Sequence, residues 1–174
     1  DMQRRRRPGL VVASAGWERC ARDYRVVRPG FPWLAVELVV EGGGVLELAG
    51  RRHRLVSGSL YAYGPGVAHA IAADPSAPPL KYFLDLAGDD AAGLLAGIGL
   101  APGRLASLPV HAEVRALLDV LIAAGRRGQT AACAALARAA VLLAGAGMVE
   151  PGRASGALAA YVRCRDWLER HGGD

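Results

Sequence analysis

Two glycine-rich hairpin segments constrain the fold of this 174-residue chain more than any other feature. Residues 58–69 read Gly-Ser-Leu-Tyr-Ala-Tyr-Gly-Pro-Gly-Val-Ala-His, and residues 36–50 carry an apolar run, three glycines and Val-Leu-Glu-Leu. Each segment predicts strand, tight turn and strand, because glycine reaches positive φ at little cost. Two such segments within thirty-five residues predict a small antiparallel barrel with a central cavity. A cavity with one histidine and several tyrosines favours small-molecule binding over catalysis.

The first half of the chain predicts about eight short strands bounded by turn residues. They are expected at residues 10–13, 24–27, 33–41, 45–48, 52–56, 59–63, 68–72 and 80–86. The pattern changes at Gly88, after which helices are expected at residues 89–95, 111–125, 130–145 and 155–171. The fold class is therefore mainly β with C-terminal α-helices. Its parts are a basic arm at residues 1–20, a barrel at 21–88 and a helical segment at 89–174.

The strand expected at residues 33–41 has two unlike faces. Trp33, Glu37 and Glu41 share one face with an alanine and a valine, whereas the other face holds only leucine and valine. This pattern is typical of a cavity wall that faces a polar ligand. An ordinary half-exposed strand has the same pattern.

The net charge of +5 belongs to the N-terminal end of the chain. Residues 1–30 carry eight arginines against three acidic groups, whereas the thirteen basic and thirteen acidic groups of residues 31–174 cancel. The run Arg4 to Arg7 indicates either an arm that touches DNA phosphates or an acidic surface, or a solvated tail. No basic DNA-reading face is expected on the barrel or the helices.

Cysteine spacing and hydropathy predict the compartment. Cys20, Cys133 and Cys164 are odd in number, far apart and without a C-x-x-C spacing, which predicts reduced, mostly buried thiols in a cytosolic protein. No uninterrupted apolar run reaches the ~18 residues of a transmembrane helix, so no membrane partner is expected. The apolar run at residues 10–13 is too short for a signal peptide.

His69 is the first candidate for chemistry: its ring either bonds a neighbouring carbonyl or lines the cavity. A metal site needs about three converging ligands, and none of His53, His111 and His171 has a ligand spacing to His69. The sequence also lacks a Gly-x-Ser-x-Gly nucleophile motif and a phosphate-binding P-loop. No catalytic residue, metal or cofactor is therefore expected.

Aromatic residues make up only 6% of the chain, yet five lie on or beside the expected strands: Trp33, Tyr61, Tyr63, Tyr82 and Phe83. Such rings either fill the core or stack on a flat ligand whose polar edge meets charged groups. The charged groups expected beside them are Arg28, Glu37, His69 and Lys81. Lys81 is the only lysine in the chain.

The helices at 111–125 and 129–145 have more apolar surface than one barrel wall needs. This excess predicts either a dimer interface or ordinary packing against the barrel. The interface residues expected on the first of these helices are Val114, Leu117, Leu118, Leu121 and Ile122.

Three segments together resemble the N-terminal effector-binding domain of AraC-type transcription regulators. They are residues 38–51 (Leu-Val-Val-Glu-Gly-Gly-Gly-Val-Leu-Glu-Leu-Ala-Gly-Arg), residues 57–69, and residues 81–88 (Lys-Tyr-Phe-Leu-Asp-Leu-Ala-Gly). The resemblance covers roughly residues 10–171. It implies a cupin-like jelly-roll barrel followed by helices that dimerise.

The chain also departs from related metalloproteins. Metal-dependent cupins carry a His-x-His pair and a glutamate ahead of the first hairpin, but residues 28–35 here, Arg-Pro-Gly-Phe-Pro-Trp-Leu-Ala, contain no histidine. The resemblance therefore implies a metal-free binding barrel. By similarity to the arabinose-responsive member, Arg28, Ile71 and Phe83 fall at places comparable to its sugar contacts. The apolar side chains of Ile71 and Phe83 argue against arabinose itself.

Regulators of this kind carry two helix-turn-helix motifs after the effector domain, and none follows in this sequence. Residues 157–171 resemble the interdomain helix that leads into the first motif. The chain is thus expected to be the sensor half of a longer bacterial protein that contacts DNA only through a C-terminal domain absent here. In the family the arm before the barrel relays ligand occupancy, a role that the resemblance gives to residues 3–20.

The expected function is ligand sensing and dimerisation in the cytoplasm, as a homodimer and without catalysis. The effector would be a sugar-like or other small polar or aromatic metabolite held in the barrel. The alternative is a small metal-dependent cupin enzyme. A third interpretation is a constitutive dimerisation module with a filled barrel.

Overall fold

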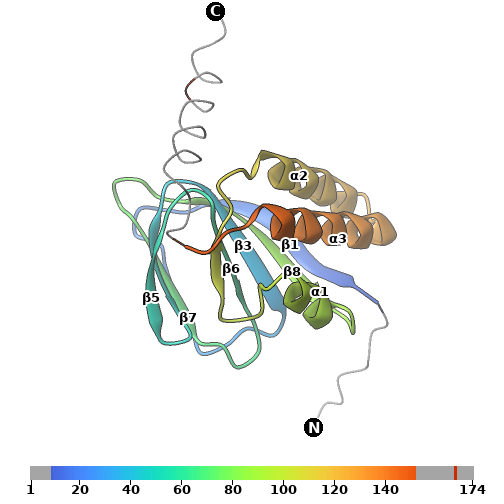
Figure 1. Ribbon diagram of the computed structural model, residues 1–174. Helices are drawn as coiled ribbons and strands as arrows, with labels where there is room; N and C mark the ends of the chain where they lie inside the picture. The colour runs from blue at the N-terminus through green and yellow to red at the C-terminus, as the bar shows by residue number, and fades with distance from the viewer. Residues whose placement is uncertain (1–8, 152–166, 168–174) are drawn as a thin grey trace, which may run out of the picture.

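The computed structural model describes residues 9–151 and Trp167. The elements described along this part of the chain, shown in Figure 1, are β1 (Val11–Arg19), β2 (Arg25–Arg28), β3 (Leu34–Glu41), β4 (Gly44–Leu48), β5 (Arg51–Leu55), β6 (Ser59–Tyr63), β7 (His69–Ala73), β8 (Leu80–Ala87), α1 (Ala91–Gly97), β9 (Leu105–Ser107), α2 (Ala112–Arg126) and α3 (Thr130–Gly147).

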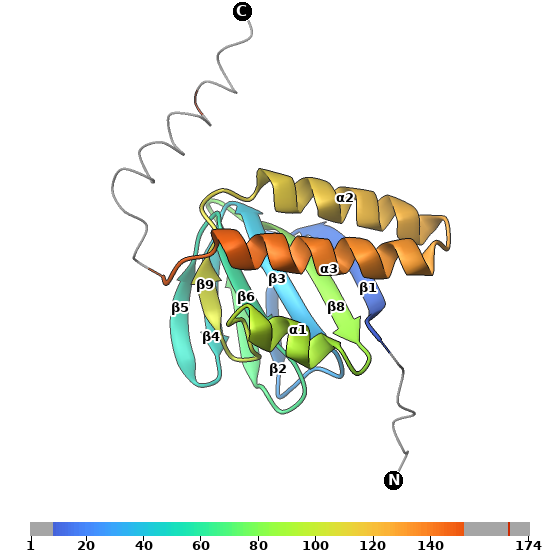
Figure 2. The ribbon, with the colours of Figure 1, turned by 45° about the vertical axis from the view of Figure 1, so that its right-hand side comes forward.

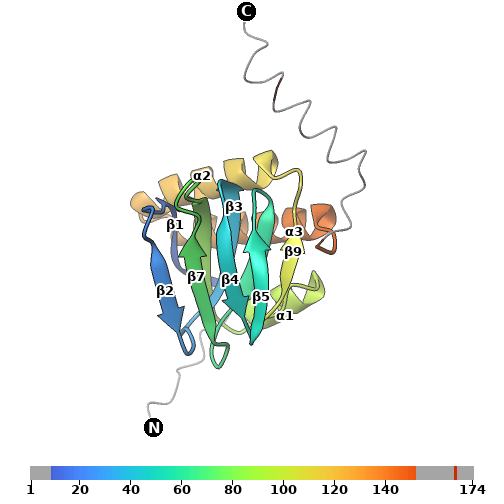
Figure 3. The ribbon, with the colours of Figure 1, turned by 90° about the vertical axis from the view of Figure 1, so that its left-hand side faces the viewer.

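The strands form two antiparallel sheets that face each other. One sheet has five strands in the order β1-β8-β3-β6-β9, and the other has four in the order β2-β7-β4-β5. Apart from β9, this is the strand order of an eight-stranded jelly roll, in which consecutive strands other than β4 and β5 lie in different sheets. The glycine turns at residues 42–44 and 64–66 therefore connect the two sheets, and the hairpins predicted there are wrong. Figure 3 shows the four-stranded sheet in front and the helices behind the other sheet. The predicted fold class, a mainly β jelly roll with C-terminal helices, is confirmed.

The N-terminal boundary of the barrel differs from the prediction. Residues 11–19, assigned above to the basic arm, form β1, which pairs along its length with β8. The strand joins the sheet because Val12 and Ala15 pack against the main apolar core. Residues 1–8, with their four arginines, lie outside the described residues.

Two features of the second half also differ from the prediction or lie beyond it. No strand was expected between the helices predicted at residues 89–95 and 111–125, but β9 lies there and extends the five-stranded sheet by pairing with β6. The helix expected at residues 155–171, and Cys164 within it, lie outside the described residues, apart from Trp167. Cys20 and Cys133 are buried free thiols, as expected.

The largest apolar core lies between the five-stranded sheet and the helices. Figure 2 shows α2 and α3 lying side by side across this sheet, with α1 near its lower end. On β3, Leu38 and Val40 point into this core, which is the all-apolar face predicted from alternation. A second, smaller cluster inside the barrel includes Ala35 and Val39 from the other face of β3.

Helix α2 is fixed to the sheet by packing and by a polar contact. Val114, Leu118 and Leu121 are at most 5% exposed and belong to the main core. Beside them, the Tyr82 hydroxyl donates to Asp119 Oδ1 at 2.8 Å. The five α2 residues predicted for a dimer interface therefore pack within one protomer, with Leu117 and Ile122 half-buried against the same core. The large apolar side chains exposed on α2 and α3 are Val120, Leu142 and Leu143.

Helix α3 is long and apolar enough to cross a membrane by length and composition alone. Its buried residues, including Cys133, Ala137 and Val141, belong to the core beneath it. Arg138, the charged residue on this helix, reaches Asp90 Oδ2 at 2.7 Å. Asp90 thus pairs with an arginine and makes no side-chain cap on α1.

We expect Leu121→Ala to lower the free energy of unfolding by about 2–5 kcal/mol, because the truncation leaves a cavity in the main core. Leu121 is 1% exposed, whereas Leu142 on α3 is 52% exposed. The control Leu142→Ala should change stability by about 0.5 kcal/mol or less. Urea denaturation at low protein concentration measures both. Equal effects would contradict this assignment of the core.

Candidate functional site

A cavity of about 190 Å³ lies inside the barrel, between the two sheets. Strands of both sheets and the loops before β2 and β3 contribute side chains to its wall. The lining residues are Glu18, Tyr24, Val26, Arg28, Phe31, Glu37, Tyr63, His69, Ile71, Lys81, Phe83 and Asp85. The wall therefore combines five formally charged side chains, a histidine and four aromatic rings. Glu37, Lys81, Asp85 and His69 are buried, which is an unusual content for a barrel interior, whereas Arg28 is exposed.

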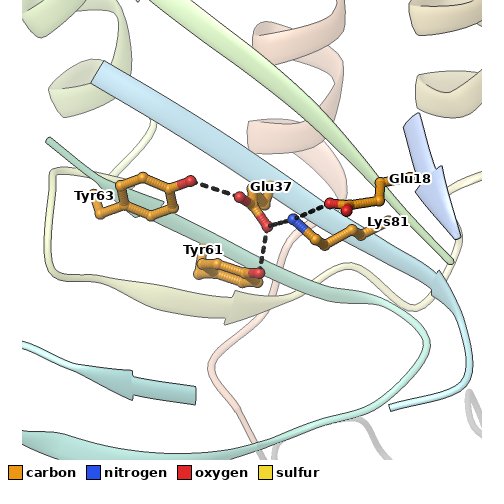
Figure 4. Close-up of polar contacts among 5 residues, drawn as sticks. All are labelled: Glu18, Glu37, Tyr61, Tyr63 and Lys81. Carbon is orange, nitrogen blue, oxygen red and sulfur yellow. Dashed lines mark hydrogen bonds and ion pairs between the residues drawn. The ribbon is translucent and has the colours of Figure 1, made fainter. Parts of the chain in front are cut away.

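Glu37 is the centre of a hydrogen-bonded network on the wall formed by the five-stranded sheet (Figure 4). Its Oε1 accepts from the Tyr63 hydroxyl at 2.5 Å, and its Oε2 accepts from the Tyr61 hydroxyl at 2.6 Å. Lys81 Nζ lies 3.0 Å from Oε2 and 3.3 Å from Glu18 Oε2. Four neighbouring strands, β1, β8, β3 and β6, supply these five residues.

Burial and charge fix the protonation states of this network. Burial disfavours the charged form of Lys81, but the adjacent carboxylates, Glu37 foremost, outweigh it and hold the pKa of Lys81 above its usual range. Burial, and then the Glu37 charge, raise the pKa of both Tyr61 and Tyr63 well above the usual tyrosine value. Both phenols therefore stay protonated and donate, and Lys81 remains a cation paired with Glu37.

Asp85 places a third carboxylate on the same wall. It accepts a short hydrogen bond from the Ser14 hydroxyl of β1. Burial raises the pKa of Asp85 above its usual range, although the Ser14 hydrogen bond opposes this effect. Asp85 is therefore more readily protonated than a surface aspartate.

His69 stands on the opposite wall, at the start of β7. Its ring stacks on Tyr63 with centroids 3.8 Å apart, and its Nδ1 lies 3.3 Å from the Val67 carbonyl oxygen. Its Nε2 is buried and has no hydrogen-bond partner within the described residues. Burial lowers the pKa of His69, despite the opposing Val67 hydrogen bond, so the ring is neutral at pH 7. Both alternatives left open for this residue hold together, since it bonds a carbonyl and lines the cavity.

Apolar and aromatic side chains complete the enclosure. The Arg28 guanidinium lies over the Phe31 ring, 5.0 Å from its centroid. Phe83 packs against Gly16 on β1, where an added Cβ would lie 2.7 Å from the Phe83 Cζ atom. The glycine thus leaves the space into which the Phe83 ring fits.

The structure brings seven of the nine predicted ligand residues to one cavity: Arg28, Glu37, Tyr63, His69, Ile71, Lys81 and Phe83. Tyr61 is completely buried and supports Glu37 without lining the cavity. Trp33, which precedes β3, does not line it either.

Sequence reasoning missed Glu18, Tyr24, Val26, Phe31 and Asp85. Period-two alternation on β8 puts Asp85 on the face of Lys81 and Phe83, so this signal was available. Glu18 lies opposite Lys81 in the pairing of β1 with β8. That position could not be found once residues 1–20 had been assigned to an arm.

Two further observations bear on the location and chemistry of the site. A more open groove of about 830 Å³ lies between β1 and the facing ends of α2 and α3, lined mainly by small and apolar residues. We place the site in the smaller cavity because the buried charged groups are there.

Among residues 9–151 and Trp167, no three His, Cys, Asp or Glu side chains are arranged to hold a metal ion.

A sequence model of one protein family, the AraC-like ligand binding domain, matches residues 11–142. No curated protein matches the sequence. Among solved structures, the plu4264 protein from Photorhabdus luminescens is similar over 44% of this chain, at 9% identity and a TM-score of 0.38. KdgF from a Halomonas species is similar over 49%, at 21% identity and a TM-score of 0.37.

A salicylate 1,2-dioxygenase from Pseudaminobacter salicylatoxidans is similar over 56% of this chain, at 17% identity and a TM-score of 0.37. The matched region spans 62% of the Photorhabdus protein, 76% of KdgF and 25% of the dioxygenase. These similarities are too distant to bear on chemistry.

We expect Glu37→Gln to lower the free energy of unfolding by about 3–5 kcal/mol, because it leaves Lys81 buried without its nearest counter-charge. The control Glu41→Gln breaks the exposed 3.0 Å pair of Glu41 with Arg19 and should cost less than about 1 kcal/mol. Urea denaturation at pH 7 compares the two variants. A Glu37→Gln variant as stable as the control would contradict the proposed burial of this ion pair.

The lowered pKa of His69 also predicts a pH dependence of stability. The folded state holds the ring neutral, while the unfolded chain takes up a proton near the usual value of 6.5. The histidine's contribution is therefore complete above pH 6.5 and is lost as the pH falls below it. Denaturation of wild type and His69→Phe should show a stability difference that shrinks between pH 7 and pH 5. A constant difference would contradict a buried neutral ring.

Proposed function

Because this chain belongs to the AraC-like ligand-binding domain family, we propose that its barrel cavity binds a small effector and reports its presence to a transcription regulator. The family match covers residues 11–142, which include all the strands that the structure describes and most of the helical layer. The domain is thus a ligand-sensing regulatory domain. The effector class proposed is a sugar-like or other small polar or aromatic metabolite.

The observation that carries this proposal is the separation of the cavity from the main core. The helices bury the outer face of the five-stranded sheet, so the fold does not need a fully apolar barrel interior. Glu37, Lys81, Asp85 and His69 instead occupy the interior next to a small open volume. A cavity with a few fixed polar groups and aromatic walls is the usual form of a small-molecule site.

Strand β1 offers a physical connection between ligand and regulator. Three of its residues lie against side chains that line the cavity. Ser14 donates a hydrogen bond to Asp85, Gly16 lies beside the Phe83 ring, and Glu18 pairs with Lys81. Val12 and Ala15 of the same strand pack against the core under the helices. A ligand that fits better in one position of β1 would shift the equilibrium between two arrangements of the helical layer.

The remaining parts of the proposal concern assembly and location. We propose a homodimer in the cytoplasm that contacts DNA through a helix-turn-helix domain of the full-length protein. Exposed Val120, Leu142 and Leu143 on α2 and α3 support an apolar contact surface on the helical layer. The predicted interface residues Val114, Leu118 and Leu121 do not support it, because they are buried within the protomer.

A thermal-shift screen against sugars, polyols and aromatic metabolites tests the sensing function. A ligand at about 100 times its Kd should stabilise the protein by about 2.7 kcal/mol and raise its Tm by several degrees. Arg28→Ala should reduce this shift because Arg28 lines the cavity. Arg25 is an exposed arginine on the same strand that lies outside the cavity wall, so the control Arg25→Ala should leave the shift unchanged.

Metal analysis of the same purified protein tests the alternative function, a metal-dependent enzyme. Stoichiometric iron, manganese or zinc that depends on His69 would favour the metal-dependent cupin enzyme. A ligand whose Tm shift is equally reduced by Arg28→Ala and Arg25→Ala would bind elsewhere and contradict the assigned cavity.

A further inference from the structure

We propose that the outer face of the four-stranded sheet binds an acidic, amphipathic helix of a partner protein. This face lies on the side of the barrel opposite the helical layer, and in Figure 3 it is turned toward the viewer with no helix of the described residues over it. It is separate from the barrel cavity, so the inference goes beyond ligand sensing and does not depend on it.

The outward side chains of this sheet follow from the alternation of its strands. Leu46, Leu48 and Ile71 belong to the apolar cluster inside the barrel. Leu55 belongs to the same cluster, and Val26 lines the cavity. Because successive side chains of a strand point to opposite faces, the strand residues that alternate with these five point away from the interior.

Cross-strand pairing sets these outward residues in two rows, each running from β2 through β7 and β4 to β5. The first row consists of Arg25, Ala72, Val45 and Arg54. The second row consists of Val27, Ala70, Glu47 and Arg52. Arginine therefore stands at both edges of the first row and at one edge of the second, with mostly small or apolar residues between them.

The charge of this sheet is unbalanced. Its four strands together carry five arginines and one glutamate. Three other arginines of the described chain each pair with a carboxylate at 2.7–3.1 Å. Arg25, Arg52 and Arg54 are exposed and make no such ion pair within the described residues. A partner that carries carboxylates would supply the missing counter-charges.

The apolar centre of the face distinguishes a protein partner from a nucleic acid. Arginines on edge strands also prevent sheets from pairing edge to edge, but that role requires nothing of the residues between them. Here Val27 is 65% exposed, and Val45 is half-buried on the same face. A surface for phosphates would carry further cations at these positions, and the exposed Glu47 would repel phosphate.

The spacing of the arginines fits a helix that lies along the strands. Arg25 and Arg54 are separated by three inter-strand steps, or about 14 Å, and an α-helix with its side chains is about 10–12 Å across. A groove of about 660 Å³ at one end of the face, lined by Val45, Arg54 and Val56 among others, adds a concave seat. A second copy of this chain does not fit, because a two-fold contact through this face would set arginines against arginines.

The test uses three fluorescent probes. The first is a helical peptide with glutamates on both sides of a leucine and alanine stripe, the second is a scrambled peptide of the same composition, and the third is a short DNA duplex. Fluorescence anisotropy measures their affinities for the whole chain. We expect the amphipathic peptide to bind at least tenfold more tightly than the scrambled one and to shift the nuclear magnetic resonance signals of Val27, Val45 and Ala72.

Substitutions at exposed positions locate the contact without disturbing the core. Arg54→Glu should weaken binding of the amphipathic peptide at least fivefold, because it reverses a charge at the edge of the face. Val27→Ser should weaken it about threefold by removing apolar contact. The matched control Arg126→Glu makes the same charge change at an exposed position on α2 and should change the affinity less than twofold.

Three results would overturn the inference. Equal binding of the two peptides, or equal losses from Arg54→Glu and Arg126→Glu, would reduce the interaction to general attraction toward a basic protein. Tighter binding of the DNA duplex than of the amphipathic peptide would identify a phosphate-binding surface instead. Absence of amphipathic-peptide binding at millimolar concentration would leave the arginines with the edge-protecting role alone.

Discussion

A carboxylate inside the barrel is the constraint on which the rest of the structure depends. An ionised group removed from water is tolerated only with a counter-charge and several hydrogen-bond donors. Glu37 obtains both, from Lys81 and from two tyrosines that burial keeps protonated. Since these partners come from the strands on either side of β3, the network also sets how β8 and β6 align with it. Replacing these groups with apolar ones would fill the interior and remove the reason for a cavity.

The helical layer supplies most of the apolar burial that stabilises the fold, so the barrel interior can hold polar groups. A sheet closed on itself normally relies on its interior for stability, and a small domain has little apolar surface to spare. Here α2 and α3 cover the outer face of the five-stranded sheet, and most of the large buried side chains lie there. The barrel interior keeps only a small apolar cluster, beside which Lys81, Asp85 and His69 are placed.

Local patterns predicted the strands and most of the site, whereas tertiary context decided the rest. The alternation at residues 33–41 correctly separated the face of Glu37 from the apolar face. The glycine turns correctly marked strand ends, but the hairpins predicted there were wrong, because each turn joins strands of different sheets. The sequence indicated a strand at residues 10–13, but the arginines nearby led to residues 1–20 being assigned to an arm, and the pairing of residues 11–19 with β8 was not foreseen. Helix α2 shows the same limit: an apolar face looks alike whether it meets a partner or its own sheet.

The absence of a side chain at position 16 has a consequence for the evolution of this site. The Phe83 ring occupies space beside β1 that any larger residue at position 16 would fill. Even one methyl group there would push the ring toward the opposite wall and shrink the room for a guest. Related chains that differ only at this position would therefore admit compounds of different bulk while keeping the same charged network, so that effector choice could diverge without loss of the fold.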